Sequence, residues 1–370
     1  STQSRSSAAS DVYKRQCLIL LIGCVSENKH MQYPETKKDD IQEVIFGKTV
    51  TDPYRWLEDF TSEEASAWVD KQNDLTNTFL ENKYQRKIKK ELEEIWITQD
   101  ISIPFKRGDK TFYYFDDGEQ QQAVFMMKAC DNCEAKVLLD PNKFSSDGTI
   151  SLSDISVSPD GKYLAYSISD GGSDWRKWKV LNIEDDRETD DLIEWSKFSY
   201  AVWESDSSGF YYQKYSQPDE ELSDINRSPQ LFFHKLGQSQ LEDQLIYEDQ
   251  QNPDFSWSIN VPEKGDYRVL SIGEGTDERN FLYISLDRSL NFIPLIDKFE
   301  ASYRFLGGNA ETLWFFSNLD APNGKILTLN IADKKFQWKE LIGEKTFPIS
   351  GASIAAVSYT HLTLPTIYSV

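Results

Sequence analysis

Histidine is scarce in this chain, with 3 residues among 370, and so are cysteine, with 4, and methionine, with 3. So few histidines argue against a multi-histidine metal centre and leave little material for histidine-based catalysis. Basic side chains are also few relative to acidic ones, because 61 acidic against 40 basic side chains give a net charge of −21. Such a chain would repel a phosphate backbone rather than hold it. No apolar run approaches the roughly 18 residues that span a bilayer. We therefore expect no nucleic-acid partner, no metal and no cofactor.

What is abundant indicates a folded, strand-rich protein. Hydrophobic residues make up 39% of the chain and charged residues 27%, which is ordinary for a globular protein and unlike a disordered one. Aromatic residues reach 13%, a composition that favours strands. The length is comfortable for two domains and allows a sizeable core.

The two ends of the chain differ from the rest in composition. Residues 1–16 hold five serines in the first ten positions and show no apolar periodicity, and residues 357–370 carry no charged side chain. Both stretches resemble conceptual translations of sequencing-adapter sequence. An ordinary disordered head and a short terminal strand are the alternative. We treat these ends as a non-native head and tail and exclude them from fold reasoning.

Residues 17–32 combine a short apolar stretch with a polar linker. The stretch ends in Leu21-Ile22-Gly23-Cys24, which resembles a bacterial lipobox, in which the cysteine is lipidated and becomes the mature N-terminus. We interpret this segment as the remnant of a lipoprotein signal peptide, with Cys24 as the candidate lipidation site; an apolar patch of no consequence is the alternative. Lipid chains at Cys24 would be the only link to a membrane. The expected location is the periplasm, with or without that anchor, and the cytoplasm is the alternative.

Cys130 and Cys133 form a Cys-Asp-Asn-Cys motif between strand-like runs at residues 123–128 and 136–139. One such pair, without a second pair or neighbouring histidines, is a weak zinc signal. We interpret the motif as a hairpin turn, with or without a local disulfide.

Within residues 33–99, residues 61–97 form the one long stretch with helical periodicity. Thr61 and Glu64 match a capping box, and a break near Asn82 divides the stretch into two helices. Apolar residues recur at steps of three and four, so one face is broadly apolar and should be buried against another part of the protein. The apolar positions are Ala65, Trp68, Leu75, Phe79, Ile88, Leu92 and Ile95.

Residues 100–356 repeat one pattern, in which a polar turn precedes a strongly apolar strand. The turn glycines Gly108, Gly161, Gly209 and Gly265 are 53, 48 and 56 residues apart, and Asn309 follows 44 residues later. Periods of this size are typical of β-propeller blades with four strands. The sequence therefore predicts a mainly β fold, an incomplete β-propeller of about five blades preceded by an N-terminal α-helical segment. Further strands are expected at residues 178–183, 192–195, 230–235 and 244–247.

Residues 47–59, which include the run Asp52-Pro53-Tyr54-Arg55-Trp56-Leu57-Glu58-Asp59, resemble the opening of prolyl oligopeptidases. Shorter matches continue in order to about residue 345: Trp68–Asn73, Leu139–Asn142, Gly172–Trp175, Lys197–Ser199 and Leu295–Asp297. In that family an N-terminal segment precedes a seven-bladed propeller, and an α/β-hydrolase domain with the catalytic Ser, Asp and His follows. The resemblance implies that residues 33–99 are the N-terminal segment and residues 100–356 about five of the seven blades. It also implies that the hydrolase domain, their intramolecular partner, is missing from this chain.

The residues themselves also indicate that the catalytic triad is missing. A nucleophile elbow needs G-x-S-x-G, because its strained turn tolerates only small flanking residues. Residues 171–175 end in a bulky tryptophan, and residues 351–355 have no α/β pattern around them. Of the histidines, His30 lies in the linker, His361 in the tail and His234 in an apolar strand, so none is placed to serve as the triad base. We expect no catalytic residue in the chain and interpret His234 as structural.

The function implied by the resemblance is that of a serine endopeptidase fragment. The parent enzyme would cleave short peptides after proline, with the propeller admitting peptides by size, and the fragment alone would be inactive. Phe198 matches a propeller aromatic that lines the outer substrate pocket in the family; a blade-core phenylalanine is the alternative. Tyr247 stands where the family often has a smaller residue, which would change the shape of the subsite.

Two other functions compete with this interpretation. A stand-alone propeller could serve as a binding or scaffold module of the cell envelope, although such a module would not need the amphipathic helices. A propeller glycosidase with S-x-D-x-G-x-x-W turns is disfavoured, because Ser207 stands where that turn needs an aspartate.

Overall fold

The computed structural model describes residues 32–59, 61–218, 227–262, 265–332, 336–354 and 362–363. Two compact units divide the chain, an N-terminal unit, Ser1–Trp96, and a C-terminal unit, Ile97–Val370. Residues 1–31, including Cys24, and most of the tail lie outside the described residues. None of the helices that the structure describes is long and apolar enough to cross a membrane.

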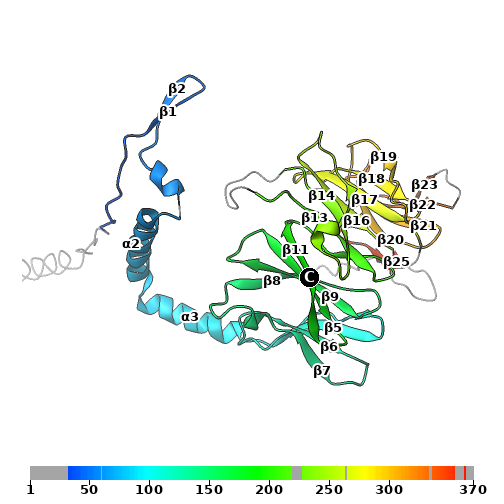
Figure 1. The fold of residues 1–370 in the computed structure, drawn as a ribbon, viewed down its shortest axis with the longest axis horizontal. Helices are drawn as coiled ribbons and strands as arrows, with labels where there is room; N and C mark the ends of the chain where they lie inside the picture. The colour runs from blue at the N-terminus through cyan, green and yellow to red at the C-terminus, as the bar shows by residue number, and fades with distance from the viewer. Residues whose placement is uncertain are drawn as a thin grey trace, which may run out of the picture. The chain divides into compact units, whose positions relative to one another are not determined.

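In the N-terminal unit, a hairpin leads to a short 3-10 helix and then to two α-helices (Figure 1). The two helices are separated at Glu81 and Asn82, and the Asn82 carboxamide accepts hydrogen bonds from the first amides of the second helix. The expected division near Asn82 is therefore confirmed. The elements are β1 (Gln42–Ile45), β2 (Lys48–Thr51), η1 (Arg55–Glu58), α2 (Glu63–Leu80) and α3 (Lys83–Trp96).

The start of α2 corrects the expected capping box. Ser62, not Thr61, is the N-cap, and its hydroxyl accepts a hydrogen bond from the Ala65 amide at 3.2 Å. Thr61 instead donates to the Asp59 carboxylate at 2.7 Å. Because the helix begins one residue later than expected, Glu64 does not reach back to the cap and pairs with Lys37 at 3.0 Å.

Two tryptophans tie η1 to the beginning of α2. The rings of Trp56 and Trp68 meet edge to face with centroids 6.4 Å apart. Their indole N–H groups donate to the Lys37 carbonyl and the Thr36 hydroxyl. Through Trp56, the run at residues 52–59 therefore packs against the start of α2 and the segment around Lys37.

The apolar face of α3, by contrast, is not buried as the periodicity predicted. Ile88, Leu92 and Ile95 are 55%, 53% and 71% exposed. Phe79, near the end of α2, is 63% exposed, whereas Ala65 at its start is buried.

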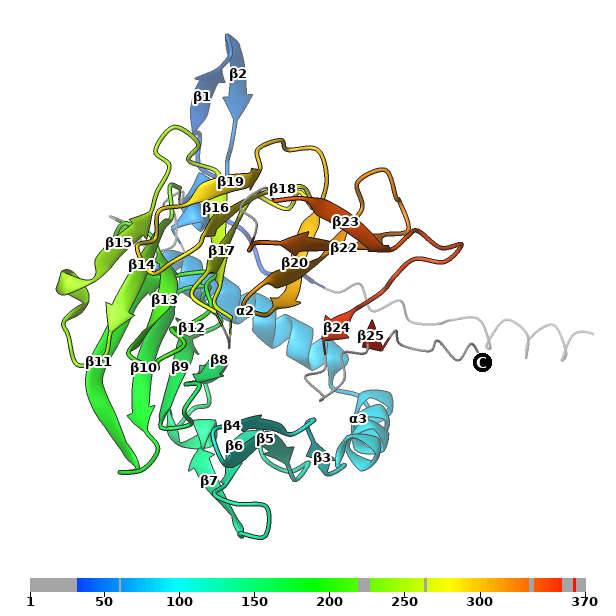
Figure 2. The ribbon, with the colours of Figure 1, turned by 90° about the vertical axis from the view of Figure 1, so that its right-hand side faces the viewer.

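The C-terminal unit contains a five-stranded, an eight-stranded and two four-stranded antiparallel sheets (Figures 1 and 2). We divide the eight-stranded sheet into two at its weakest connection, which gives the five units that we call blades 1 to 5. This confirms the expected partial propeller. Blades 2 and 3 are bridged by one strand pair, Ser196 with Lys214. A short pair, β24 (Ser353–Ile354) and β25 (Leu362–Thr363), follows blade 5.

In blades 2 to 5 the strands pair in chain order, whereas in blade 1 both β3 and β4 pair with β5. Blade 1 holds β3 (Asp100–Ile101), β4 (Phe105–Arg107), β5 (Lys110–Asp116), β6 (Val124–Lys128) and β7 (Ala135–Leu139). Blade 2 holds β8 (Ile150–Val157), β9 (Tyr163–Asp170), β10 (Arg176–Asn182) and β11 (Arg187–Ser196), and blade 3 holds β12 (Val202–Trp203), β13 (Gly209–Lys214), β14 (Gln230–Lys235) and β15 (Gln244–Tyr247). Blade 4 holds β16 (Phe255–Asn260), β17 (Arg268–Glu274), β18 (Asn280–Ser285) and β19 (Ile293–Ile296), and blade 5 holds β20 (Tyr303–Gly308), β21 (Thr312–Ser317), β22 (Lys325–Asn330) and β23 (Trp338–Ile342).

The core lies between blades rather than inside any one of them. Four clusters of buried side chains fill the four seams between consecutive blades. Both faces of an inner blade are therefore apolar, which explains the density of aromatic residues. Buried aromatics at the successive seams are Phe125 with Tyr166, Trp178 with Trp203, Tyr211 with Trp257, and Tyr267 with Phe315.

The repeated polar turns contact one another from blade to blade. The Gly108 amide donates to the Pro159 carbonyl, and the Asp160 amide donates to the Ser207 hydroxyl, each at 3.2 Å. A side chain at Gly108 would place its Cβ 2.5 Å from the Asp160 carbonyl oxygen, so only glycine permits this approach. Arg288 makes the corresponding contact between blades 3 and 4, because it pairs with Asp206 in the turn of blade 3 and with Asp266 in the turn of blade 4.

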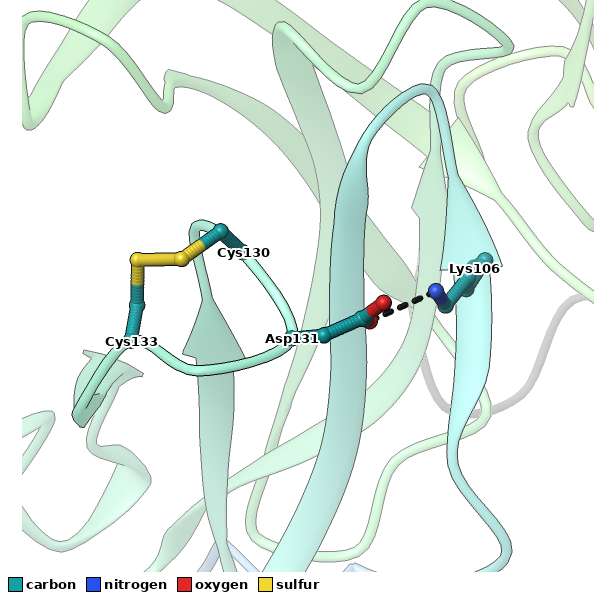
Figure 3. The surroundings of a disulfide bond; sticks show 4 residues. All are labelled: Lys106, Cys130, Asp131 and Cys133. Atoms are coloured by element: carbon teal, nitrogen blue, oxygen red, sulfur yellow. Dashed lines mark hydrogen bonds and ion pairs between the residues drawn. A yellow bond between two sulfur atoms is a disulfide. The ribbon is translucent and has the colours of Figure 1, made fainter.

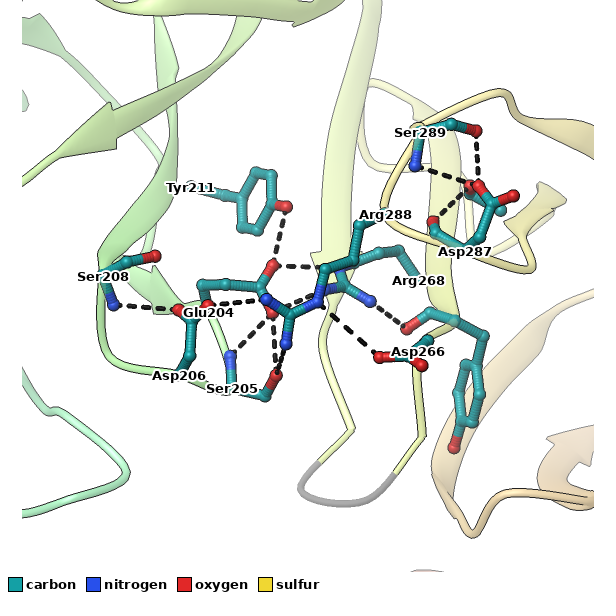
Figure 4. Close-up of polar contacts among 12 residues, drawn as sticks. Glu204, Ser205, Asp206, Ser208, Tyr211, Asp266, Arg268, Asp287, Arg288 and Ser289 are labelled. Carbon is teal, nitrogen blue, oxygen red and sulfur yellow. Dashed lines mark hydrogen bonds and ion pairs between the residues drawn. The ribbon is translucent and has the colours of Figure 1, made fainter.

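A buried ion pair joins blades 3 and 4 across the seam between them (Figure 4). Arg268 on β17 is fully buried, and its guanidinium binds both oxygens of the Glu204 carboxylate, which follows β12. The Tyr211 hydroxyl also donates to this carboxylate at 3.0 Å. Burial alone would raise the pKa of Glu204, but the Arg268 guanidinium lowers it below its ordinary value.

The Cys-Asp-Asn-Cys motif is a hairpin turn between β6 and β7, and it is closed by a Cys130–Cys133 disulfide (Figure 3). Lys106 on β4 binds the Asp131 carboxylate inside this loop at 2.6 Å. The turn interpretation is confirmed, and the disulfide settles the alternative left open by the sequence. No group of three or more metal-ligating side chains occurs among the described residues.

Candidate functional site

A cavity of about 1070 Å³ opens on blades 3, 4 and 5. Its wall includes the first strands of blades 4 and 5, the segment leading into β12, and the turn between β17 and β18. Aromatic and polar groups share the lining, as is usual for a ligand site. Lining residues used below are Phe198, Tyr200, Tyr215, Trp257 and Arg279.

The Phe198 side chain lies on this cavity wall and is 62% exposed. Its backbone is left-handed, with φ 51°, a conformation that costs energy for a bulky residue and is often found at functional sites. Neighbouring contacts hold the segment in place: the Gln213 amide donates to the Ser199 hydroxyl at 2.7 Å, and Arg176 donates to the Ser199 carbonyl. Phe198 is thus placed at the cavity rather than in a blade core, and its role toward a substrate stays a prediction.

Two of the sequence motifs meet beside Phe198. The Lys197 ammonium lies 4.9 Å from the Trp175 ring centroid and 5.5 Å from that of Phe198. Trp175 also packs edge to face on Trp195 and Tyr215. The Lys197 side chain is only 14% exposed, and its ammonium also lies 3.9 Å from the Asp174 carboxylate. Lys197 therefore contacts both the Trp175 and the Phe198 rings.

Tyr247 does not line the cavity. Its ring packs edge to face on Trp257 at 5.0 Å and on Tyr283 and Phe292, within the core of the seam between blades 3 and 4. A change at Tyr247 would therefore reach the cavity through neighbours that line it, Trp257 and the strand partner Leu231.

Sequence reasoning missed Tyr200 and Arg279 on the cavity wall. Tyr200 is 70% exposed and stands two residues after Phe198, so its spacing in the same turn was an available signal. Arg279 is held by Asp277 through both carboxylate oxygens, and its guanidinium lies 4.9 Å from the Phe299 centroid. Hydrogen bonds from Arg279 lower the pKa of Asp277 to about 2. Nothing in the local pattern at residues 277–279 separates this pair from an ordinary exposed turn.

The described residues hold no serine activated by a histidine. Ser173, in the first near-miss motif, uses its hydroxyl to accept the Trp175 amide in a turn. His234, the one described histidine, is fully buried in β14, and both its ring nitrogens contact carboxylates, so its ring has no free lone pair for a serine. His30 and His361 lie outside the described residues.

Comparisons by sequence and by structure both find prolyl oligopeptidases. A family model described as the prolyl oligopeptidase N-terminal beta-propeller domain matches residues 33–361. The prolyl endopeptidase of Elizabethkingia miricola is 37% identical over 323 residues, covering 86% of this chain and 46% of the relative. Prolyl oligopeptidase A of Amanita bisporigera is 30% identical, covering 84% of this chain and 46% of the relative. The chain thus spans about half the length of the curated relatives that it matches.

Solved structures agree with these matches. Prolyl oligopeptidase B from Galerina marginata bound to a 25mer macrocyclization substrate has a TM-score of 0.77 and 25% identity, covering 90% of this chain and 51% of that one. The same enzyme bound to a 35mer hydrolysis and macrocyclization substrate has a TM-score of 0.76, covering 88% and 49%.

Proposed function

Because this chain belongs to the prolyl oligopeptidase family, whose N-terminal propeller domain it carries, we propose that it is the substrate-admitting part of a serine endopeptidase that cleaves short peptides after proline. The observation that carries the proposal is the cavity of about 1070 Å³ with the exposed Phe198 side chain on its wall. An exposed aromatic on a fixed backbone can pack on a proline ring or another apolar side chain at little entropic cost. Similarity to enzymes with bound 25mer and 35mer substrates supports a peptide as the ligand.

Hydrolysis would require parts that the described residues do not contain. A serine, a base and oxyanion donors must converge within hydrogen-bond reach, and His234 is fully engaged by carboxylates. We expect the pure chain to bind peptide without cleaving it. Inhibitor-sensitive turnover of a Gly-Pro chromogenic substrate by the pure chain would contradict this.

Peptide binding can be tested directly with Phe198→Ala. The probe is a fluorescein-labelled octapeptide with one central proline, followed by fluorescence anisotropy. Losing the exposed ring should weaken binding roughly tenfold, which corresponds to about 1.4 kcal/mol. Leu241→Ala is the matched control, because Leu241 is 94% exposed and does not line this cavity. Equal weakening by both variants would contradict the proposal. Equal binding of a peptide with alanine in place of proline would favour the stand-alone binding module instead.

We further propose that the protein works in the periplasm, with Cys24 as a lipid attachment site. The Cys130–Cys133 disulfide supports this, because disulfides persist in oxidising compartments and are rare in the cytosol. A version of the chain with a restored signal peptide should incorporate radiolabelled palmitate, and Cys24→Ala should abolish the label. Unchanged labelling of Cys24→Ala, or no labelling of either version, would rule out the anchor.

A further inference from the structure

A histidine between two aspartates lies at the seam between blades 2 and 3. His234 Nδ1 is 2.8 Å from the Asp243 Oδ1 atom, and His234 Nε2 is 2.9 Å from the Asp191 Oδ1 atom. All three side chains are at most 2% exposed. Neither the peptide cavity nor the proposed function uses this group.

Both aspartates also accept hydrogen bonds from other donors. Asp191 also accepts hydrogen bonds from the Gly237 amide and the Thr189 hydroxyl, and Asp243 accepts one from the Tyr212 hydroxyl at 2.8 Å. Burial alone would raise the pKa of Asp191, but these donors and His234 lower it below its ordinary value. A carboxylate can only accept, so each ring nitrogen of His234 must donate. A neutral imidazole has one N–H and would leave a lone pair facing a carboxylate, so the imidazolium is the form of the ring that can donate to both aspartates.

These contacts connect the two blades through a short segment, residues 237–243. Asp191 belongs to β11 of blade 2, whereas His234 belongs to β14 of blade 3. The segment contains η3 (Gln240–Glu242), and Asp243 caps its C-terminal end. Within it, the Gln240 carboxamide bonds to both the amide and the carbonyl of Glu194 on β11, as a neighbouring strand would.

The same segment lines a second cavity, of about 810 Å³, together with β11 and residues 214–217. Gly237, Gln240 and Leu241 line it from the segment, and Leu192 and Glu194 line it from the strand.

We propose that His234 is a charged latch that holds residues 237–243 against β11, and that loss of its second ring proton releases the segment and opens the seam between blades 2 and 3. A neutral ring can satisfy only one of the two aspartates, and the other carboxylate is then buried without its partner, which is strongly unfavourable. The other titratable group facing this set is Tyr212 of β13, which donates to Asp243. The Phe210 ring, 5.3 Å from the imidazole centroid, shields the set from water.

The pH range of the latch follows from the charges. Burial alone would lower the pKa of His234, but Asp191 and Asp243 raise it from 6.5 to about 9. Because the pKa of His234 is raised on folding, its contacts with the two aspartates stabilise the folded protein fully below pH 6.5. This stabilisation is lost as the pH rises through about 9. The latch is therefore closed at neutral pH and released under alkaline conditions.

The direct test is ¹⁵N NMR of the histidine rings in the full chain, which has only 3 histidines to assign. At pH 7.5 both ring nitrogens of His234 should be protonated, with a titration midpoint near 9. Asp243→Asn should lower that midpoint by roughly 1–3 pH units, since it removes one adjacent negative charge. Asp190→Asn is the matched control, because this exposed neighbour of Asp191 lies outside the network and should leave the midpoint unchanged.

Amide hydrogen exchange then shows whether the ring holds the segment. Exchange of residues 237–243, corrected for intrinsic rates, should accelerate by up to roughly tenfold per pH unit as His234 deprotonates. A single ring proton at pH 7.5, or a midpoint near 6.5, would overturn the proposal without any variant. Titration of His234 with unchanged exchange in residues 237–243 would also overturn it, because the ring would then be buried without acting as a latch.

Discussion

At the scale of single residues, the seams between blades depend on a few buried charges. Glu204 and Arg268 are 5% and 0% exposed, and each is the other's main counter-charge. A buried ion pair adds little to stability compared with an apolar pair, but breaking it leaves one charge alone in a place without water. Such a pair makes the seam between blades 3 and 4 intolerant of single substitutions.

We predict that Arg268→Met lowers the free energy of unfolding by about 3–5 kcal/mol, because it strands the Glu204 carboxylate. Arg288→Met is the control, since that guanidinium is 50% exposed and should contribute no more than about 1 kcal/mol. Urea denaturation measures both. Equal losses in the two variants would contradict the prediction.

The same ion pair makes stability depend on pH. Because the pKa of Glu204 is lowered in the folded protein, the contribution of Glu204 to the free energy of unfolding is complete above pH 4.5. That contribution is lost as the pH falls through the pKa of the folded state.

At the scale of elements, the polar turns between the first and second strands hold neighbouring blades in register. Gly108 and Gly161 are left-handed, with φ 56° and 72°, and each approaches the backbone of the other's turn. The sequence periodicity marked these turns, but their mutual contact appears only when the blades are side by side.

We predict that Gly108→Ala is more damaging than Gly171→Ala. Both glycines have nearly the same φ, 56° and 57°, so both substitutions carry the same backbone strain of about 1 kcal/mol. A new Cβ at Gly108 would meet the Asp160 carbonyl oxygen at 2.5 Å, whereas nothing lies within 4 Å at Gly171. Gly108→Ala should therefore lose about 1–3 kcal/mol more, measured by denaturant unfolding. Equal losses would show that the turns can separate without cost.

At the scale of the whole molecule, the two units differ in how much of their apolar surface is covered. Buried clusters fill the four described seams of the C-terminal unit, whereas only Ala65 is buried in α2 and no residue is buried in α3. A helix stabilised by few buried contacts opens more readily than a packed strand.

We predict from this difference that amides in residues 61–97 exchange with deuterium faster than those in residues 161–235. Mass spectrometry of a monomeric sample measures both regions in one experiment. Equal protection would show that the helices are covered in solution.

Because exposed apolar surface also favours association, we expect the isolated chain to be poorly soluble. A chain that stays monomeric at high concentration would contradict this.

The sequence alone determined the local elements and the class of fold. The expected strands at residues 230–235 and 244–247 coincide with β14 and β15, because apolar runs between turn residues have few other solutions. Those at residues 192–195 and 178–183 belong to the longer β11 and to β10. The glycine spacing predicted five blades for the same reason, since each turn and strand repeats a local pattern. The cap at Ser62 was missed because two adjacent hydroxyl residues can each begin a helix.

Only the tertiary structure decided which distant residues meet. Asp191 and His234 are 43 positions apart, and Glu204 and Arg268 are 64 apart, with no local pattern linking either pair. The same holds for Lys197 over Trp175 beside Phe198. Hydrophobic periodicity records which face of a strand is buried, but not which strand of the next blade covers it. Packing of whole blades makes that choice, and the buried charges and the cavity depend on it.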